Sequence, residues 1–87
     1  MEKKKVAVFL ANGFEEIEAV TPIDLLQRAG ITVDTVSITK DNLVESARRM
    51  KILADKIIDD IDFSEYDMLI LPGGPGVGNY FNSQTLL

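Results

Sequence analysis

The chain has 87 residues, a hydrophobic fraction of 46% and a formal net charge of −5. This length suits one small domain or part of one, and the apolar content excludes a largely disordered chain. The acidic balance argues against nucleic acid as a partner, because phosphate binding needs a concentrated basic surface. The sequence has neither an apolar run of about 18 residues nor a secretory signal, so we expect a cytoplasmic protein that does not bind membranes.

The sequence contains no cysteine and no histidine. The chain therefore has no disulfide, no thiol nucleophile and no imidazole base. A zinc site built from carboxylates alone would be unusual. We expect no metal and no cofactor.

The first segment with a clear pattern is residues 5–11, which are apolar after Lys5 and rich in valine. This pattern is typical of a central strand of a parallel sheet, buried on both faces. Asn12 and Gly13 signal a loop, and helical spacing then continues to Arg28. Pro22 predicts a kink in this helix, and Gly30 predicts its end in the left-handed conformation.

The remaining elements are shorter. Residues 31–38 predict a second strand, residues 40–42 a turn, and residues 43–45 and 49–53 two short strands or a hairpin. Residues 55–62 predict a strand end and a loop, residues 63–66 a helical turn, and residues 68–71 a buried strand. A glycine loop is predicted at residues 72–78, and the start of a helix at residues 79–87, with Ser83 as its N-cap. The order is that of the first half of a doubly wound α/β fold.

One full helix cannot cover both faces of a parallel sheet. We therefore expect this chain to expose apolar surface unless another segment covers it. We interpret residues 1–87 as the N-terminal half of a single domain: a fragment, or one chain of a processed or split protein.

Three carboxylates lie where the first strand meets the helix. Glu15 and Glu16 fall in the predicted first turn, and Glu15 and Glu18 share a helix face. Ile17 and Val20 are expected to mark a neighbouring buried face. A carboxyl against such a wall would lose solvation, which favours the protonated form and lets it donate to a nucleophile or substrate. The alternative, which these residues alone favour, is an acidic first turn that complements the helix dipole.

A glycine loop follows the last predicted strand. The N–H groups of Gly73 and Gly74 could converge on an oxyanion, or the two glycines could simply form a tight turn. The loop has neither the Lys-Ser/Thr of a Walker motif nor the glycine spacing of a dinucleotide fingerprint. Arg28 and Arg48 fit surface ion pairs, or sites for an anionic substrate group or a partner's carboxylate.

Three stretches together resemble the ThiJ/PfpI superfamily, in its DJ-one branch. They are residues 11–18 (ANGFEEIE), 22–30 (PIDLLQRAG) and 67–74 (DMLILPGG), and the resemblance covers essentially the whole chain. It implies a flavodoxin-like α/β fold, also called class I glutamine amidotransferase-like, which is a three-layer sandwich with a parallel sheet. It also implies a homodimer.

The resemblance further implies site residues. In this family a protonated glutamate matching Glu18 hydrogen-bonds a catalytic thiolate, and the glycine matching Gly74 supplies an oxyanion N–H. Substrate contacts are implied for Glu15, Gly73 and Arg48. An interface position is implied for Arg28. The cysteine and its histidine partner should come from the C-terminal half of the fold, in a second chain or a missing segment.

The implied function is half of a cysteine-dependent hydrolase or lyase that acts on small carbonyl or amide substrates, as a glyoxalase, deglycase or peptidase-like enzyme. The alternative is a non-enzymatic oxidative-stress sensor or chaperone-like module, in which the cysteine is oxidised. A receiver-like or flavodoxin-like binding domain is disfavoured, because residues 11–13 hold neither paired acids nor a phosphate loop.

Overall fold

The computed structural model describes residues 4–74. Its elements are β1 (Lys5–Leu10), α1 (Glu16–Arg28), β2 (Thr32–Ser37), β3 (Leu43–Glu45), β4 (Lys51–Leu53), β5 (Lys56–Ile57), two 3₁₀ turns (Ile58–Asp60 and Phe63–Glu65) and β6 (Met68–Ile70). The predicted order of strands and helix is confirmed, and β3 and β4 pair as an antiparallel hairpin. The predicted helix after residue 78, with Ser83 as its N-cap, and most of the glycine loop lie outside the described residues.

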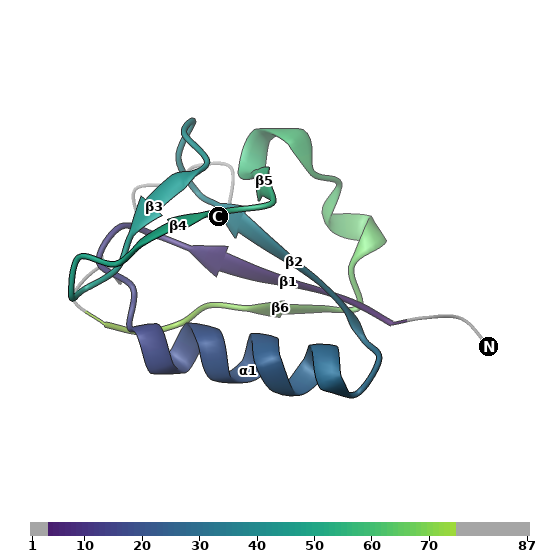
Figure 1. Ribbon diagram of the computed structural model, residues 1–87. Helices are drawn as coiled ribbons and strands as arrows, with labels where there is room; N and C mark the ends of the chain where they lie inside the picture. Colours follow the sequence, from purple (N-terminus) through teal and green to yellow (C-terminus); the bar gives the residue numbers. More distant parts are fainter. Residues whose placement is uncertain (1–3, 75–87) are drawn as a thin grey trace.

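The main sheet has the strand order β5-β2-β1-β6, and all of its pairings are parallel (Figure 1). The chain passes from β1 to β2 on one side and later returns to β6 on the other side of β1. The order of connection therefore reverses at β1. In open α/β sheets, ligands bind at such a reversal, outside the carboxyl ends of the strands.

Strand β1 packs on both of its faces, as the sequence predicts. Its alternate residues Val6, Val8 and Leu10 join the apolar cluster that includes Ala19 of α1. The intervening residues join the second cluster, in which Phe9 stacks on Phe63 with ring centroids 5.9 Å apart. Figure 1 shows α1 on one face of the sheet and the 3₁₀ turns on the other. The sheet is therefore the middle of three layers, and β1 is one of its inner strands.

The face of α1 that packs on the sheet is not the predicted one. Ala19 is fully buried, and Ile23 and Leu26 pack against the same cluster. Ile17 is 72% exposed and Val20 is 46% exposed, so the expectation that they mark a buried face is wrong. Ile17 lies two residues before Ala19, which is about 200° around the helix and therefore on nearly the opposite side.

Both ends of α1 have recognisable caps. Glu15 is the N-cap residue rather than part of the first turn, since its side chain accepts a hydrogen bond from the Ile17 N–H. At the other end Gly30 has φ +82°, as predicted, and its N–H donates to the Gln27 carbonyl. The Ile31 N–H donates to the Leu26 carbonyl, which completes a Schellman motif. The helix runs through Pro22 without a break.

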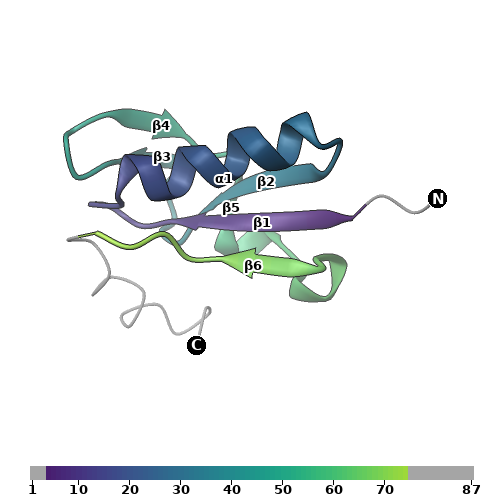
Figure 2. The same cartoon turned by 90° about the horizontal axis from the view of Figure 1, so that it is seen from below.

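Strand β6 is an edge strand of the sheet formed by residues 4–74. The sequence predicts that this strand is buried, and that prediction is wrong. Met68 is 56% exposed and Leu69 is 42% exposed. Figure 2 shows α1 running along β1 and β2, with β6 outside its cover. The expected exposure of apolar surface is thus confirmed. Within this part of the chain, no helix is long and apolar enough to cross a membrane.

Candidate functional site

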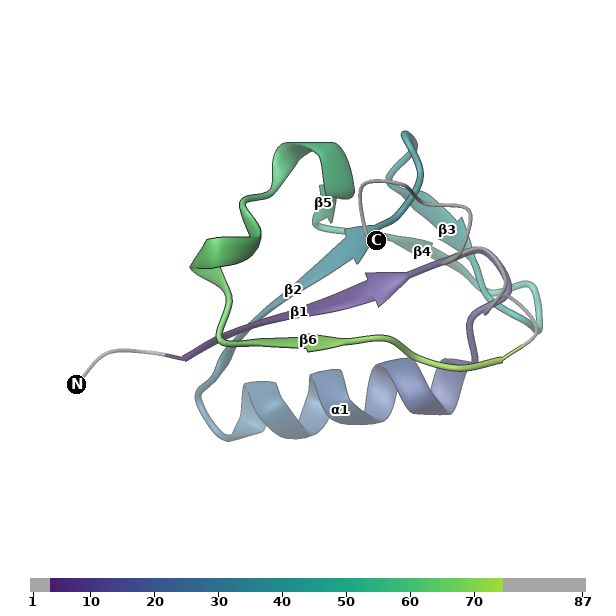
Figure 3. The same cartoon turned by 180° about the vertical axis from the view of Figure 1, so that it is seen from behind.

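Three segments meet at the carboxyl end of β1: the start of α1, the turn of the β3–β4 hairpin, and the chain that follows β6 (Figure 3). The hairpin is tied to the β1–α1 loop by backbone bonds. The Gly13 N–H donates to the Glu45 carbonyl, and the Ala47 N–H donates to the Phe14 carbonyl, both at 2.8 Å. The acidic helix start is therefore held between the hairpin turn and the loop after β6.

Gly73 binds the start of α1 through both of its backbone polar groups. Its N–H donates to Oε1 of Glu18 at 3.0 Å, and its carbonyl accepts from the Glu15 N–H at 2.8 Å. In a capping box, the glutamate at the third helical position would accept directly from the N–H of the N-cap residue. Here Gly73 is inserted between these two groups, which fixes the loop after β6 on the helix.

This arrangement bears on the expected oxyanion site. The Gly73 N–H is already bound to the Glu18 carboxylate, so it is not open to an oxyanion. The Gly74 N–H makes no hydrogen bond within residues 4–74. Of the two expected donors, Gly74 is therefore the one whose N–H has no acceptor in the part of the chain that the structure describes.

The loop approaches the helix closely at both glycines, and the approach requires glycine at Gly74. A Cβ atom on Gly73 would lie 2.8 Å from Oε1 of Glu18. Gly74 has φ +113°, and a Cβ atom there would lie 2.8 Å from the backbone nitrogen of Glu15 and 3.0 Å from the Gly13 carbonyl oxygen. Residues other than glycine rarely adopt such a φ. The atoms that a Cβ on Gly74 would meet belong to the backbone, and they cannot move aside as the end of a flexible side chain can.

Glu18 is anchored but not enclosed by the described residues. Its Oε1 accepts from Gly73, and its Oε2 makes no hydrogen bond within the range 4–74. The residue is exposed, and the described residues do not form the expected apolar wall, because Ile17 and Val20 point away from the core. Among residues 4–74, one carboxyl oxygen is therefore held by a hydrogen bond and the other has no partner.

Glu15 and Arg48 form an ion pair at the same place. The Arg48 Nη1 donates to Oε2 of Glu15 at 2.9 Å, and Oε1 of Glu15 caps the Ile17 N–H at 3.3 Å. The Glu15 side chain is 23% exposed and that of Arg48 is 70% exposed. The structure thus brings Glu15, Glu18, Gly73 and Arg48 together, with Arg48 bound to a carboxylate of its own chain.

The sequence analysis gave Glu16 no role in the site, yet the pKa of its carboxyl is well below the usual range. The Ser46 hydroxyl donates to Oε2 of Glu16 at 2.5 Å, and the Arg48 N–H donates to the same atom at 2.8 Å. The Ser46 hydrogen bond is the main cause that lowers the pKa of Glu16 to about 2, with a smaller contribution from Arg48. The acidic first turn was the only sequence signal for this residue, because its partner Ser46 lies 30 residues away.

Arg28 lies apart from this group. It is in the last turn of α1, and the helix has 13 residues, or about 20 Å of length. Its Nε donates to Oδ1 of Asp24 at 2.9 Å, and its side chain is 76% exposed. Within the described part of this chain, Arg28 does not reach Glu18.

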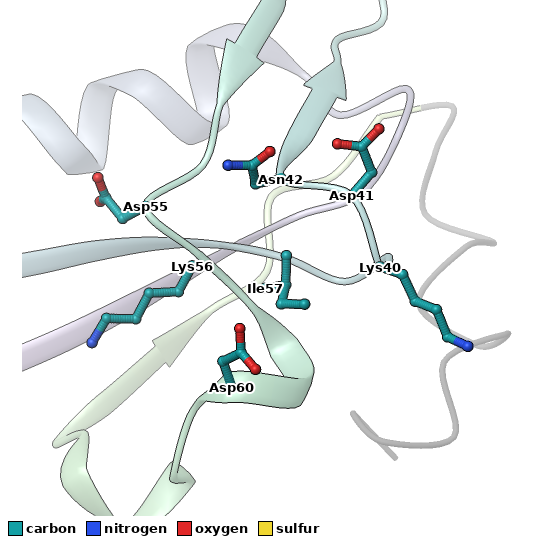
Figure 4. Close-up of a pocket in the computed structure, with 7 residues that line it drawn as sticks. All are labelled: Lys40, Asp41, Asn42, Asp55, Lys56, Ile57 and Asp60. Atoms are coloured by element: carbon teal, nitrogen blue, oxygen red, sulfur yellow. The ribbon is translucent and has the colours of Figure 1, made fainter.

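A second concave region lies beside β5, and Figure 4 shows its lining: Lys40, Asp41, Asn42, Asp55, Lys56, Ile57 and Asp60. Some of its charged side chains are paired with neighbours. Asp55 exchanges hydrogen bonds with Thr35, and the Lys56 amine pairs with Asp34 at 3.2 Å. Among residues 4–74, no group of three or more acidic side chains could hold a metal ion. This region is not a candidate site.

Residues 4–87 match the model of the DJ-1/PfpI family. The chain belongs to the DJ-1/PfpI family. It is similar to protein DJ-1 homolog B of Arabidopsis thaliana, with 36% identity over 95% of this chain and 19% of that protein. It is also similar to the putative cysteine protease YraA of Bacillus subtilis, with 35% identity over 82% of this chain and 42% of that protein.

Solved structures agree with this DJ-1/PfpI assignment. The oxidized DJ-1 of Toxoplasma gondii superimposes with a TM-score of 0.90 and 39% identity, over 95% of this chain and 46% of that one. The flavodoxin-like α/β fold predicted from the sequence is confirmed by this likeness. The chain spans less than half the length of these relatives.

Proposed function

We propose that this chain is the N-terminal half of a DJ-1/PfpI domain that acts as a cysteine-dependent hydrolase or lyase on small carbonyl or amide substrates. The hydrogen bond between Gly73 and Glu18 is the observation that supports this most strongly. It places an anchored carboxyl and a glycine loop together where the strand order reverses at β1. Ligands of open α/β sheets bind at that place.

Each residue has a role in this proposal. The Gly73 N–H fixes Oε1 of Glu18, which leaves Oε2 to donate a proton in a hydrogen bond to a thiolate from the other half. Burial by that half would favour the protonated carboxyl. The Gly74 N–H would stabilise the oxyanion that forms when the thiolate adds to a carbonyl carbon. Glu15 and Arg48 would line the substrate side of the site.

The proposed partners follow from the surfaces left exposed. The next strand and helix of the same fold would cover β6, where Met68, Leu69 and Leu71 are exposed. A second copy of the protein would cover the outer face of α1, where Ile17 and Leu25 are 72% and 60% exposed and Arg28 would lie at the interface. The complete protein would be a cytoplasmic homodimer.

The first experiment is intact-mass analysis and peptide sequencing of the protein purified from its source. A continuing or second polypeptide with a reactive cysteine supports the proposal, and an 87-residue species without a thiol contradicts it. The complete protein is then assayed with methylglyoxal, glycated amino acids and short peptides. Turnover that is lost in Glu18→Ala supports the enzyme. A peroxide-dependent mass increase without any turnover points instead to a redox sensor.

A further inference from the structure

The turn of the β3–β4 hairpin is organised around one buried hydroxyl. Ser46 is 4% exposed, and its Oγ accepts a hydrogen bond from the Met50 N–H at 2.9 Å. The single proton of this hydroxyl is therefore free to point at Glu16, whose Oε2 lies 2.5 Å away. Arg49, in the same turn, has φ +66°, an uncommon conformation for a residue other than glycine. The turn has a specific shape that Glu16 holds from the helix side.

Glu16 also contacts Arg48 at two places. Its Oε2 accepts from the Arg48 backbone N–H at 2.8 Å, and its Oε1 lies 3.4 Å from Nη1 of the guanidinium. The Glu16 side chain is 12% exposed, whereas that of Arg48 is 70% exposed. Packing therefore fixes Glu16 far more than it fixes the Arg48 side chain. The same Nη1 reaches Oε2 of Glu15.

We propose that Glu16 is a positioning residue, which holds the hairpin turn against α1 and so directs the Arg48 guanidinium onto Glu15 at the site. This inference rests on the proposed function, since it concerns the residues that line the same site. Glu15 is in turn the residue whose N–H holds the Gly73 carbonyl. A displaced Glu15 would therefore also disturb the loop that anchors Glu18.

The hydrogen-bond pattern allows the two parts of this role to be separated. Both the Ser46 hydroxyl and the Arg48 N–H donate to Oε2 of Glu16. In Glu16→Gln, an amide oxygen at that position keeps both bonds, while an NH₂ group replaces the oxygen that faces the guanidinium. Glu16→Gln therefore tests the direction of Arg48, and Glu16→Ala removes the support of the turn as well. Glu45→Gln is a matched control, because it removes one nearby charge whose carboxylate makes no hydrogen bond within residues 4–74.

The test is a double-mutant cycle in the complete protein, with Glu16→Gln and Arg48→Met, read as kcat/KM on the substrate found in the first assay. We expect Glu16→Gln to lower kcat/KM roughly three- to tenfold, and to have no further effect once Arg48 is replaced, which is the behaviour of coupled residues. Glu45→Gln should have the wild-type value. Equal effects of Glu16→Gln with and without Arg48 would show a merely structural role and overturn the inference.

A second readout does not depend on turnover. In nitrogen-15 NMR spectra, the guanidinium of Arg48 should rotate slowly in the wild type and in Glu45→Gln, and rapidly in Glu16→Gln. If the complete protein turns over no substrate but this difference is present, the proposed function fails and the positioning role stands. If rotation is the same in all three proteins, the positioning role is wrong, whether or not the protein is an enzyme.

Discussion

The backbone N–H of Gly73 donates to the Oε1 atom of Glu18 across 3.0 Å, although the two residues are 55 positions apart in the sequence. This bond joins the loop after β6 to the first turn of α1. It fixes one oxygen of the Glu18 carboxyl and leaves the other without a partner among residues 4–74. The proposed chemistry depends on this division between an anchored oxygen and an open one.

The two glycines of the loop are expected to differ in their tolerance of alanine. In Gly74→Ala, the new Cβ would meet backbone atoms of Glu15 and Gly13 at a φ of +113°, so we expect a loss of about 2–3 kcal/mol in the free energy of unfolding. In Gly73→Ala, the contact is with the end of the Glu18 side chain, which can move, and the loss should be smaller.

Gly30→Ala is the control for this comparison. Gly30 has φ +82° but no atom lies within 4 Å of the position of a Cβ, so its cost is conformational alone, about 1 kcal/mol. Urea unfolding of the three variants measures the order. A Gly74→Ala protein as stable as Gly30→Ala would show that the loop does not pack against the helix as described.

The contribution of Glu16 to stability should depend on pH. Its pKa is about 2 in the folded protein, against 4.5 for an unperturbed glutamate, mainly because the Ser46 hydroxyl donates to it. A group whose pKa is lowered on folding stabilises the protein above its unfolded pKa and loses that effect as the pH falls toward its folded pKa. The stability lost in Glu16→Gln should therefore be largest above about pH 5 and shrink as the pH falls toward 2.

Urea midpoints of wild type and Glu16→Gln between pH 6 and pH 3 measure this difference. Ser46→Ala should also make the free energy of unfolding less dependent on pH over this range, because it removes the main donor that lowers the pKa of Glu16. A difference between wild type and Glu16→Gln that stays constant over this range would be inconsistent with the hydrogen bond to Ser46.

Tyr66 should matter for stability and not for the site. Its hydroxyl donates to Oδ2 of Asp34 at 2.7 Å, at the amino end of the strands, and burial together with this bond raises the pKa of Tyr66. Tyr66→Phe leaves Asp34 with Lys56 at 3.2 Å and Lys5 at 3.7 Å, so we expect a loss of only about 1–2 kcal/mol. Thermal or urea unfolding measures this loss. Catalytic activity should be unchanged, and a variant that folds but loses turnover would argue against the placement of the site.

The exposed edge at β6 predicts dye binding. Residues 1–87 expressed alone should bind 8-anilinonaphthalene sulfonate through the apolar side chains of Met68, Leu69 and Leu71. The complete protein should bind much less, because its second half would cover this edge. Equal fluorescence from the two proteins would contradict the proposed partner.

Much of the architecture could be predicted from local sequence. The continuous apolar run of β1 indicates a strand that is buried on both faces, and Gly30 indicates the end of α1 because few other residues adopt its φ. The rotation of α1 could not be predicted. Two apolar sets lie along it, Ile17 with Val20 and Ala19 with Ile23, and periodicity does not tell which one faces the core.

For the candidate site, sequence motifs indicated which residues lie together but not the hydrogen bonds between distant segments. Glu15, Glu18, Gly73 and Arg48 do converge, and the Glu-Glu-x-Glu and Pro-Gly-Gly stretches both pointed to this end of the sheet. The binding of the Gly73 N–H to Glu18 depends on how two distant segments pack, as does the contact of Glu16 with Ser46. Neither could be read from spacing along the chain.

The pKa of the reactive thiol in the complete protein tests the central claim most directly. It is measured from the pH dependence of the rate of alkylation by iodoacetamide, in wild type, in Glu18→Leu and in the control Glu65→Gln at the other end of the sheet. If Glu18 donates to the thiolate, the thiol pKa should be low in wild type and Glu65→Gln, and should rise in Glu18→Leu toward the value of about 8.5 for a free cysteine. The same thiol pKa in all three proteins would contradict the claim that Glu18 acts on the sulfur.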